Sequence, residues 1–137
     1  MAMRAGLTIA VTCAVLVACS TASGGPTNGT SLRVAFWEDG TGANPDRVWT
    51  LRCDPAAGSL QRPALACQRL SAVGMKLFAP ISPKVVCTEI YGGPQRARVT
   101  GMVEGKRVWA NFSRMNGCNI ERWAKVSPWL LPPGGVT

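Results

Sequence analysis

Four cysteines in the part of the chain after residue 30 constrain its fold more than any other feature. They are Cys53, Cys67, Cys87 and Cys118. No two of them have the CxxC spacing of zinc sites, and the chain contains no histidine, so we expect no metal site. In an exported protein, an even set of four cysteines indicates two disulfides, with three possible pairings. Pairing of nearest neighbours would close two loops, each contributing roughly 3 to 4 kcal/mol by the chain-entropy estimate.

The first 18 residues have the features of an export signal. A short basic start, Met1–Arg4, precedes an apolar run of 14 residues from Ala5 to Ala18. This run is too short to span a bilayer as a helix, which takes about 20 residues, but it suits the core of a signal peptide. We therefore expect a signal peptide at residues 1–18, whose removal would also remove Cys13, and an exported protein.

The end of the apolar run indicates a lipid anchor. Leu16-Val17-Ala18-Cys19 resembles a bacterial lipobox, in which cleavage before the cysteine leaves its thiol to carry a diacylglycerol. Ordinary secretion, with cleavage near Ser20–Ala22, is the alternative. Residues 19–30 are rich in Ser, Thr and Gly and predict a flexible tether before a domain at residues 31–137. The expected product is a cell-membrane lipoprotein on the outer face, held on the membrane surface by its anchor, or a secreted protein.

Composition argues against an enzyme. Without histidine, the chain cannot form Ser-His-Asp, Cys-His or HExxH sites, and its seven acidic residues are too scattered for a paired-carboxylate site. We expect no cofactor. The formal net charge is +8, yet only Lys106 and Arg107 are adjacent cations, and no stretch resembles a nucleic-acid-binding motif. A mildly basic surface that meets an anionic envelope or an acidic partner is the more ordinary expectation, with no nucleic acid as partner.

Local patterns predict an α+β domain built on an antiparallel sheet. A helix should begin at Pro63, which suits the first helical position, and end at Gly74. A short second helix should begin at Asn119, with Ile120 and Trp123 facing inward. No βαβ rhythm is present, so the strands should pair antiparallel. The predicted strands are Leu32–Trp37, Arg47–Arg52, Arg98–Val103 and Lys106–Arg114, the last two joined across Glu104-Gly105.

From about Leu32 to Trp123 the sequence resembles the subtilisin-inhibitor-like proteins of actinobacteria. The motifs that carry the resemblance are Cys53-x-Pro55-x-x-Gly58 continuing to Pro63 and Ala66-Cys67-x-x-Leu70, Gly101-Met102-Val103-Glu104-Gly105-Lys106-Arg107-Val108 continuing to Asn116-Gly117-Cys118, and Cys87-Thr88-Glu89-Ile90-Tyr91. The resemblance implies an antiparallel sheet of about five strands with two short helices, the nearest-neighbour disulfides Cys53–Cys67 and Cys87–Cys118, and frequent homodimers. It also implies tight reversible inhibition of subtilisin-like or trypsin-like serine endopeptidases.

The same resemblance assigns roles to individual residues. The bond attacked by the protease would be Glu89–Ile90, and Cys87, Thr88 and Tyr91 would also contact the enzyme. Asn116 would lie beneath this segment and support it by hydrogen bonds to its backbone.

Two departures from the family pattern bear on function. Glu89 stands where relatives usually have Met, Lys or Arg, and its carboxylate must lose water in the enzyme's primary pocket, which costs several kcal/mol without compensating donors. A Glu-specific serine endopeptidase is therefore a third candidate target. Gly92-Gly93-Pro94 makes the segment one residue longer, and two glycines are expected to add backbone freedom. The alternative function is a non-inhibitory envelope lipoprotein that keeps the inhibitor fold as a binding or structural module.

Overall fold

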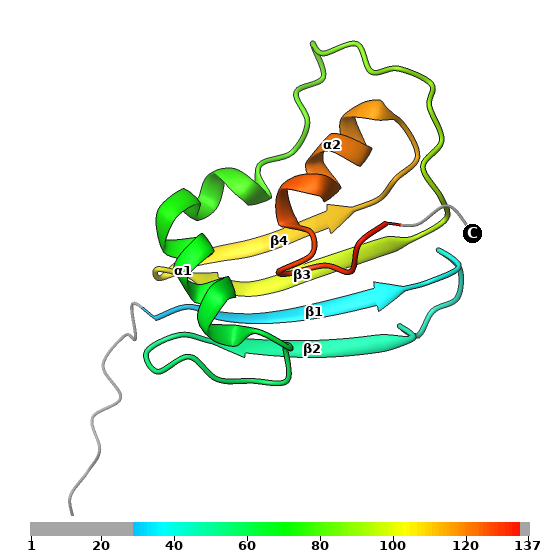
Figure 1. The fold of residues 1–137 in the computed structure, drawn as a ribbon. Coiled ribbons are helices and arrows are strands. Elements are labelled where there is room, and N and C mark those ends of the chain that lie inside the picture. The colour runs from blue at the N-terminus through cyan, green and yellow to red at the C-terminus, as the bar shows by residue number, and fades with distance from the viewer. Residues whose placement is uncertain (1–28, 135–137) are drawn as a thin grey trace, which may run out of the picture.

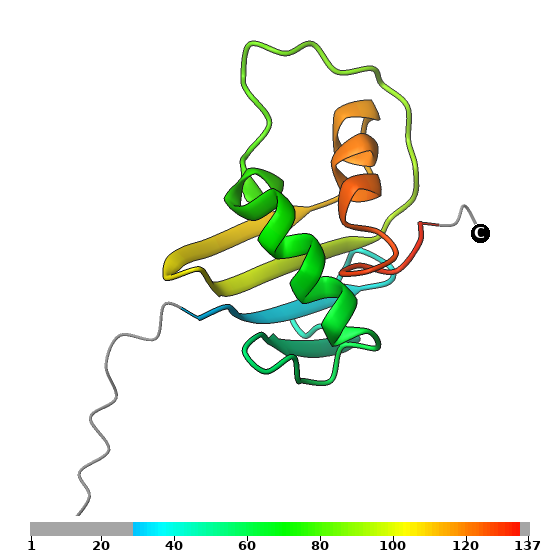
Figure 2. The same cartoon turned by 60° about the vertical axis from the view of Figure 1, so that its left-hand side comes forward.

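The computed structural model describes residues 29–134 (Figures 1 and 2). The predicted signal peptide, Cys19 and most of the tether lie outside the described residues. Its elements in chain order are β1 (Ser31–Trp37), β2 (Arg47–Arg52), α1 (Pro63–Val73), the 3₁₀ helix η1 (Gly74–Phe78), β3 (Arg96–Val103), β4 (Lys106–Phe112) and α2 (Gly117–Val126).

The described strands form one antiparallel sheet of four strands in the order β2-β1-β3-β4. A two-residue turn joins β3 to β4, and both of its residues have positive φ, 49° at Glu104 and 76° at Gly105. Positive φ at both central residues matches the right-handed twist of the paired strands. Because glycine favours this conformation, the Glu104-Gly105 pair allowed the hairpin to be predicted from the sequence.

The hydrophobic core lies between one face of the sheet and the helices (Figure 2). Alternate residues of β1 point to this face, where Leu32, Val34 and Phe36 are buried. Helix α1 covers it with Ala66 and Leu70. The rest of the core comes from α2, which contributes Trp123 and Val126, and from the segment after it, which contributes Trp129, Leu130 and Leu131.

Two indole hydrogen bonds fix the C-terminal segment to α2. Trp123 donates its Nε1–H to the Pro132 carbonyl at 2.9 Å, and Trp129 donates to the Lys125 carbonyl at 3.1 Å. A buried indole N–H needs such a partner, and these bonds hold a proline-rich segment that forms no helix or strand of its own.

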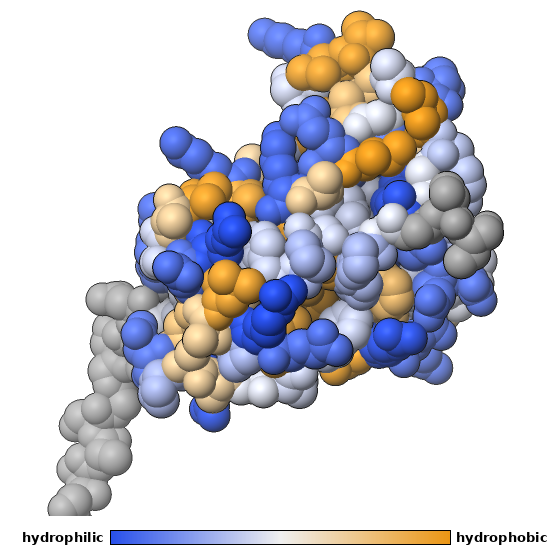
Figure 3. All heavy atoms as spheres, viewed as in Figure 1, coloured by the Kyte–Doolittle hydropathy of each residue, from blue (hydrophilic) through white to orange (hydrophobic). Residues whose placement is uncertain are grey.

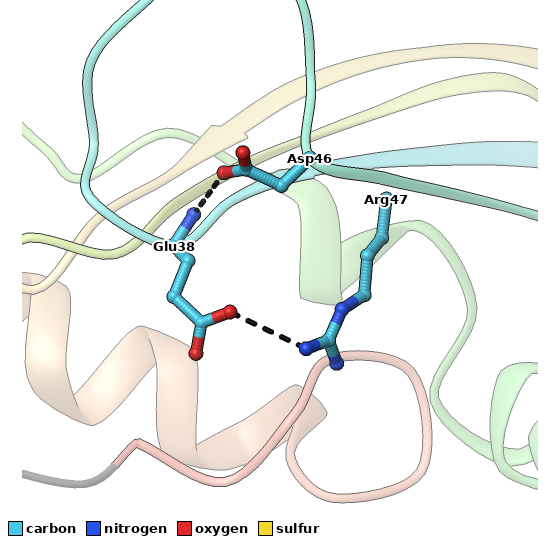
Figure 4. Close-up of polar contacts among 3 residues, drawn as sticks. All are labelled: Glu38, Asp46 and Arg47. Carbon is cyan, nitrogen blue, oxygen red and sulfur yellow. Dashed lines mark hydrogen bonds and ion pairs between the residues drawn. The ribbon is translucent and has the colours of Figure 1, made fainter.

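The loop between β1 and β2 is closed by polar contacts (Figure 4). The backbone N–H of Glu38 donates to Asp46 Oδ2 at 2.7 Å, and the Arg47 guanidinium pairs with the Glu38 carboxylate at 3.3 Å. Both side chains of the ion pair are more than half exposed, so the pair contributes little to stability. Both contacts lie where the chain turns back into β2.

The structure confirms the fold class and both nearest-neighbour disulfides, Cys53–Cys67 and Cys87–Cys118. The first helix begins at Pro63 and its C-cap is Gly74, as predicted. The described part has four strands where about five were expected. The second helix begins at Gly117, earlier than Asn119, because the Asn116 side chain caps it by accepting a hydrogen bond from the Asn119 N–H.

Candidate functional site

The candidate site lies on the segment of residues 79–95, which joins η1 to β3 without helix or strand and which we call the site loop. In both ribbon views it arches beyond the upper end of α2 (Figures 1 and 2). The Cys87–Cys118 disulfide joins it to the first turn of α2, with the two Cα atoms 5.4 Å apart. A long irregular segment is thus tied at its middle to a regular element that packs on the core.

Two backbone hydrogen bonds bracket the predicted scissile bond. The N–H of Gly117 donates to the Thr88 carbonyl at 3.0 Å, and the N–H of Gly92 donates to the Arg114 carbonyl at 2.8 Å. Gly117 is the first residue of α2, and a helix leaves its first N–H groups without partners inside the helix. The site loop supplies a carbonyl for one of these donors, so the start of α2 and the loop satisfy each other.

Between the two brackets the side chains point into solvent. Glu89 is exposed, and Ile90 and Tyr91 are 61% and 57% exposed. On the other side of Cys87, Val86 is 95% exposed. Apolar surface is visible along this upper part of the molecule (Figure 3). Exposed apolar side chains held at fixed positions by the backbone are suited to burial against a partner.

Gly92 and Gly117 allow the loop and its support to come into close contact. A Cβ added at Gly92 would lie 2.7 Å from Ile120 Cγ1, and one added at Gly117 would lie 2.0 Å from Thr88 Oγ1. Gly92 and Gly93 are both buried. The expectation that Gly92 and Gly93 add backbone freedom to the loop is therefore wrong. They are the small residues that let its backbone lie directly on α2 and the β4–α2 connection.

Asn116 is placed differently from the expectation. Its side-chain oxygen accepts hydrogen bonds from the N–H and from Nδ2 of Asn119, both at 3.0 Å. Within residues 29–134 it forms no side-chain hydrogen bond to the loop backbone, so the expected direct contact is not present. The N-cap bond fixes the orientation of the Asn116 amide at the start of α2, and in that orientation its Nδ2 donates to no carbonyl of the site loop. Support reaches the loop instead through the backbone of the next residue, Gly117.

Two arginines that sequence reasoning did not single out connect the segments that lie behind the site loop. Arg114 is buried, and its Nη1 donates to Gln95 Oε1 at 3.1 Å, which joins the end of the loop to the β4–α2 connection. Arg122 of α2 donates to the Asn111 and Phe78 carbonyls, and its guanidinium carbon lies 4.3 Å from the centre of the Phe112 ring. Partial burial lowers the pKa of Arg122, but it stays charged at any physiological pH. Neither role had a signal in local sequence pattern.

The described residues show neither a metal-binding cluster nor a membrane-spanning element. Among residues 29–134, no group of three or more Cys, Asp or Glu side chains is arranged to hold a metal ion. No helix in the same range has the length and apolarity needed to cross a bilayer.

Similarity to known proteins agrees with this geometry. The family model described as subtilisin inhibitor-like matches residues 27–116, which is more than half of the chain. The chain belongs to the subtilisin inhibitor-like family. At the level of the family, this places it among protease inhibitors and not among enzymes.

Two relatives extend the comparison. Trypsin inhibitor STI2 of Streptomyces longisporus is 36% identical over 89 residues, which cover 64% of this chain and 61% of that protein. The match thus spans less than two thirds of the relative's length. Sermetstatin of Streptomyces caespitosus, whose structure was solved in complex with Bacillus licheniformis subtilisin, has a TM-score of 0.51 and 25% identity, covering 75% of this chain and 97% of sermetstatin.

The structure brings together most of the residues predicted for the site. Cys87 and Cys118 are bonded to each other, and Thr88 is hydrogen-bonded beside them. Glu89, Ile90 and Tyr91 follow on the exposed side of the loop. Two residues beneath it, Gly117 and Ile120, were visible in the sequence only as part of a motif and as an inward-facing position. Their role depends on close approach between distant segments, which local pattern does not encode.

Proposed function

We propose that this protein is an exported inhibitor of serine endopeptidases that binds its target through the site loop, with Glu89–Ile90 as the bond presented for attack. The observation that carries the proposal is the bracketing of residues 88–92 by a disulfide and two backbone hydrogen bonds while the side chains between them stay exposed. A protease binds an extended segment on both sides of the bond that it cleaves. A loop already held in place loses little ordering entropy on docking.

The disulfide and the two backbone hydrogen bonds also explain how the protein would avoid rapid cleavage as an ordinary substrate. If Glu89–Ile90 were cleaved, Thr88 would still be held to Gly117, and Gly92 would still be held to Arg114. The two new ends would stay close together at a high effective concentration, so religation would compete with release. The contact with a protease would be of standard size, about 1,600 Å² in total. Tyr91 would be its aromatic anchor, and Val86 would add apolar contact on the other side of the bond.

Glu89 decides which protease is inhibited. Its carboxylate must leave water on entering the enzyme's primary pocket, so the pocket must offer a cation or several hydrogen-bond donors. An apolar or acidic pocket would bind this carboxylate only weakly. The target class that fits this chain is therefore a Glu-specific serine endopeptidase, with subtilisin-like and trypsin-like enzymes as weaker targets of the same loop.

The test is a titration of the oxidised chain from Ser20 against a Glu-specific endopeptidase, subtilisin, trypsin and chymotrypsin. This form keeps every described element and both disulfides. Stoichiometric inhibition of at least one enzyme, strongest for the Glu-specific one, with slow cleavage at Glu89–Ile90, is the expected result. Rapid cleavage without inhibition of any of them would contradict the proposal and leave a non-inhibitory envelope module as the function.

Variants at Glu89 test the assignment of the bond. Glu89→Lys should direct inhibition toward trypsin and Glu89→Met toward subtilisin, because each side chain suits that enzyme's primary pocket. Glu104→Lys makes the same change of charge in the β3–β4 turn and should leave specificity unchanged. If Glu89→Lys folds and trypsin is not inhibited, the bond has been assigned to the wrong position.

Export and anchoring complete the proposal. The N-terminal pattern supports cleavage before Cys19 and attachment of a diacylglycerol, so that the inhibitor would act on the outer face of the cell membrane. Radiolabelled fatty acid should be incorporated by the wild-type chain and not by Cys19→Ala. Homodimerisation, implied by the family resemblance, stays a prediction for sedimentation analysis.

A further inference from the structure

The two sides of the predicted scissile bond are held in different ways. On the carboxyl side, Cys87 is bonded to Cys118, and the Thr88 carbonyl accepts a hydrogen bond from the backbone of α2. On the amino side, the N–H of Gly92 donates to the Arg114 carbonyl at 2.8 Å. Because a hydrogen bond opens far more easily than a disulfide, the position of the amino side depends on how well Arg114 is itself fixed.

The side chain of Arg114 contacts the same side of the loop. It is 8% exposed, and its Nη1 donates to Gln95 Oε1 at 3.1 Å. A Cβ added at Gly93 would lie 3.0 Å from this nitrogen, so the guanidinium also lies directly against the loop backbone. Arg114 thus holds the amino side of the loop twice, once through its carbonyl and once through its planar guanidinium.

The C-terminal segment, residues 128–134, lies against the same guanidinium. A Cβ added at Gly134 would lie 2.2 Å from Arg114 Cζ, so the absence of a side chain lets the backbone come this close. In both ribbon views the described end of this segment lies beside the arm of the site loop that leads into β3 (Figures 1 and 2). The guanidinium is therefore held between the loop and the C-terminal segment.

The C-terminal segment is itself anchored just before Gly134. The Pro132 carbonyl accepts hydrogen bonds from Trp123 Nε1 at 2.9 Å and from Ser127 Oγ at 3.2 Å. The residue before it, Leu131, is 1% exposed and belongs to the core. Core packing and these two hydrogen bonds fix the position of Gly134 and, through it, the position of the guanidinium.

We propose that Arg114 is a positioning residue of the site loop and that the C-terminal segment keeps it in place, so that this segment takes part in inhibition. The inference rests on the proposed inhibitory function and adds to its site residues that are distant from Glu89 in the sequence. In this arrangement α2 and the disulfide hold the carboxyl side of the reactive bond, and Arg114 with the C-terminal segment holds the amino side.

The amino side matters once the bond has been attacked. The protease serine forms an ester with Glu89 as the bond to Ile90 breaks, and the serine proton passes through the enzyme's histidine to the new Ile90 amine. If this amine stays in place, it attacks the ester, restores the peptide bond and returns the proton to the serine. If it moves away, water hydrolyses the ester and a cleaved chain is released. The contacts of Arg114 should therefore favour religation over turnover.

The first test removes the guanidinium and keeps an apolar side chain. In the oxidised chain from Ser20, Arg114→Met should raise the inhibition constant about a hundredfold and speed cleavage at Glu89–Ile90, since a misplaced reacting group costs about this factor. The protease is the one that the wild-type chain inhibits most strongly. Arg114→Lys keeps the charge without the planar group and should lose nearly as much. A role in stability alone would lower the free energy of unfolding and leave inhibition by the folded variant unchanged.

The second test displaces Arg114 from the C-terminal segment. Gly134→Ala places a Cβ against the guanidinium, which can move into the adjoining hollow of about 290 Å³ beside α2. Inhibition should weaken about tenfold in this variant. In the Arg114→Met background the same change should alter inhibition by less than about twofold, because the group through which it acts is gone. Gly29→Ala is the matched control, since a Cβ added there meets no atom within 4 Å.

Hydrogen exchange of the Gly92 amide tests the positioning without a protease. In the free chain, exchange should be at least about tenfold faster in Arg114→Met than in wild type and in Gly29→Ala. A wild-type chain that inhibits no protease would contradict the proposed function, and the exchange rates would still decide whether Arg114 positions the loop.

Two results would overturn the inference. The first is unchanged exchange of the Gly92 amide in folded Arg114→Met, or in Gly134→Ala if the first variant does not fold. The second is an additive effect of Gly134→Ala and Arg114→Met on inhibition, which would show that the C-terminal segment does not act through Arg114.

Discussion

The two disulfides of this protein have similar geometry, but they connect different parts of the fold. Cys53–Cys67 joins the end of β2 to α1, and both cysteines pack against the hydrophobic core. Cys87–Cys118 joins the exposed site loop to the start of α2, and neither cysteine belongs to that core. The first therefore links elements that burial already brings together, whereas the second holds a segment that has little burial of its own.

Because of this difference, the two disulfides should contribute similarly to stability and differently to inhibition. The loops closed have sequence separations of 14 and 31 residues, so the chain-entropy estimate gives about 3 kcal/mol for Cys53–Cys67 and about 4 kcal/mol for Cys87–Cys118. On stability alone the two bonds are similar. They should differ strongly in inhibition, because only Cys87–Cys118 restrains the residues beside Glu89.

Removing Cys87–Cys118 is expected to have the largest effect on inhibition. In the variant Cys87→Ser, Cys118→Ser the residues from Thr88 to Tyr91 would have to be ordered on docking, at roughly 1 to 2 kcal/mol per residue. The inhibition constant should therefore rise at least about a thousandfold, and Glu89–Ile90 should be cleaved as in an ordinary substrate. Inhibition assays and mass spectrometry of the cleavage products measure both. A change below tenfold would mean that the backbone hydrogen bonds alone hold the loop.

Removing Cys53–Cys67 should lower stability and leave inhibition nearly unchanged. Cys53→Ser, Cys67→Ser should lower the free energy of unfolding by about 3 kcal/mol, which lowers the melting temperature by roughly 15 °C for a domain of this size. At a temperature where this variant is folded by circular dichroism, its inhibition constant should stay close to that of the wild type. A large loss of inhibition in the folded variant would show that the two regions are coupled and would contradict the comparison.

A smaller effect is expected from Gly117→Ala. Alanine at the first helical position should maintain or raise helix stability, but its Cβ would lie 2.0 Å from Thr88 Oγ1 and force the loop to move. Inhibition should weaken on the order of tenfold to a hundredfold, as a displaced reacting geometry costs. The double variant Gly117→Ala, Thr88→Ala removes the clashing oxygen and should recover most of the loss. An additive double variant would rule out this contact as the cause.

Sequence patterns predicted the regular elements of this fold well because their causes are local. The Glu104-Gly105 turn, the proline at the start of α1 and the glycine after it each determine backbone geometry within a few residues. The C-terminal segment was unpredictable for the converse reason. Trp129, Leu130 and Leu131 are core residues in a segment without helix or strand, which is held by indole hydrogen bonds to the Pro132 and Lys125 carbonyls.

The candidate site likewise has residues that the sequence predicted and supporting contacts that it did not. Cysteine number predicted two disulfides, and the family resemblance led to the Cys87–Cys118 pairing and to the residues around Glu89. The support beneath them depends on contacts between segments distant in the sequence, such as Gly92 on Ile120 and Arg114 on Gln95. Local reasoning assigned the glycines to flexibility, although burial and close approach make them the packed part of the loop.

The smallest expected effect, at Asn116, tests how support passes from α2 to the loop. Asn116→Ala removes the N-cap and should lower the free energy of unfolding by about 1 kcal/mol, with a few-fold loss of inhibition as Gly117 N–H becomes less well fixed. An aspartate side chain caps a helix as well as asparagine does, but it has no amide N–H to donate to the loop. Asn116→Asp should therefore keep both stability and inhibition close to wild type, measured by denaturant unfolding and by titration of the protease. Wild-type stability with inhibition still weak would show that the amide group acts directly on the loop backbone in the complex, as the family resemblance implied and as the free protein does not display.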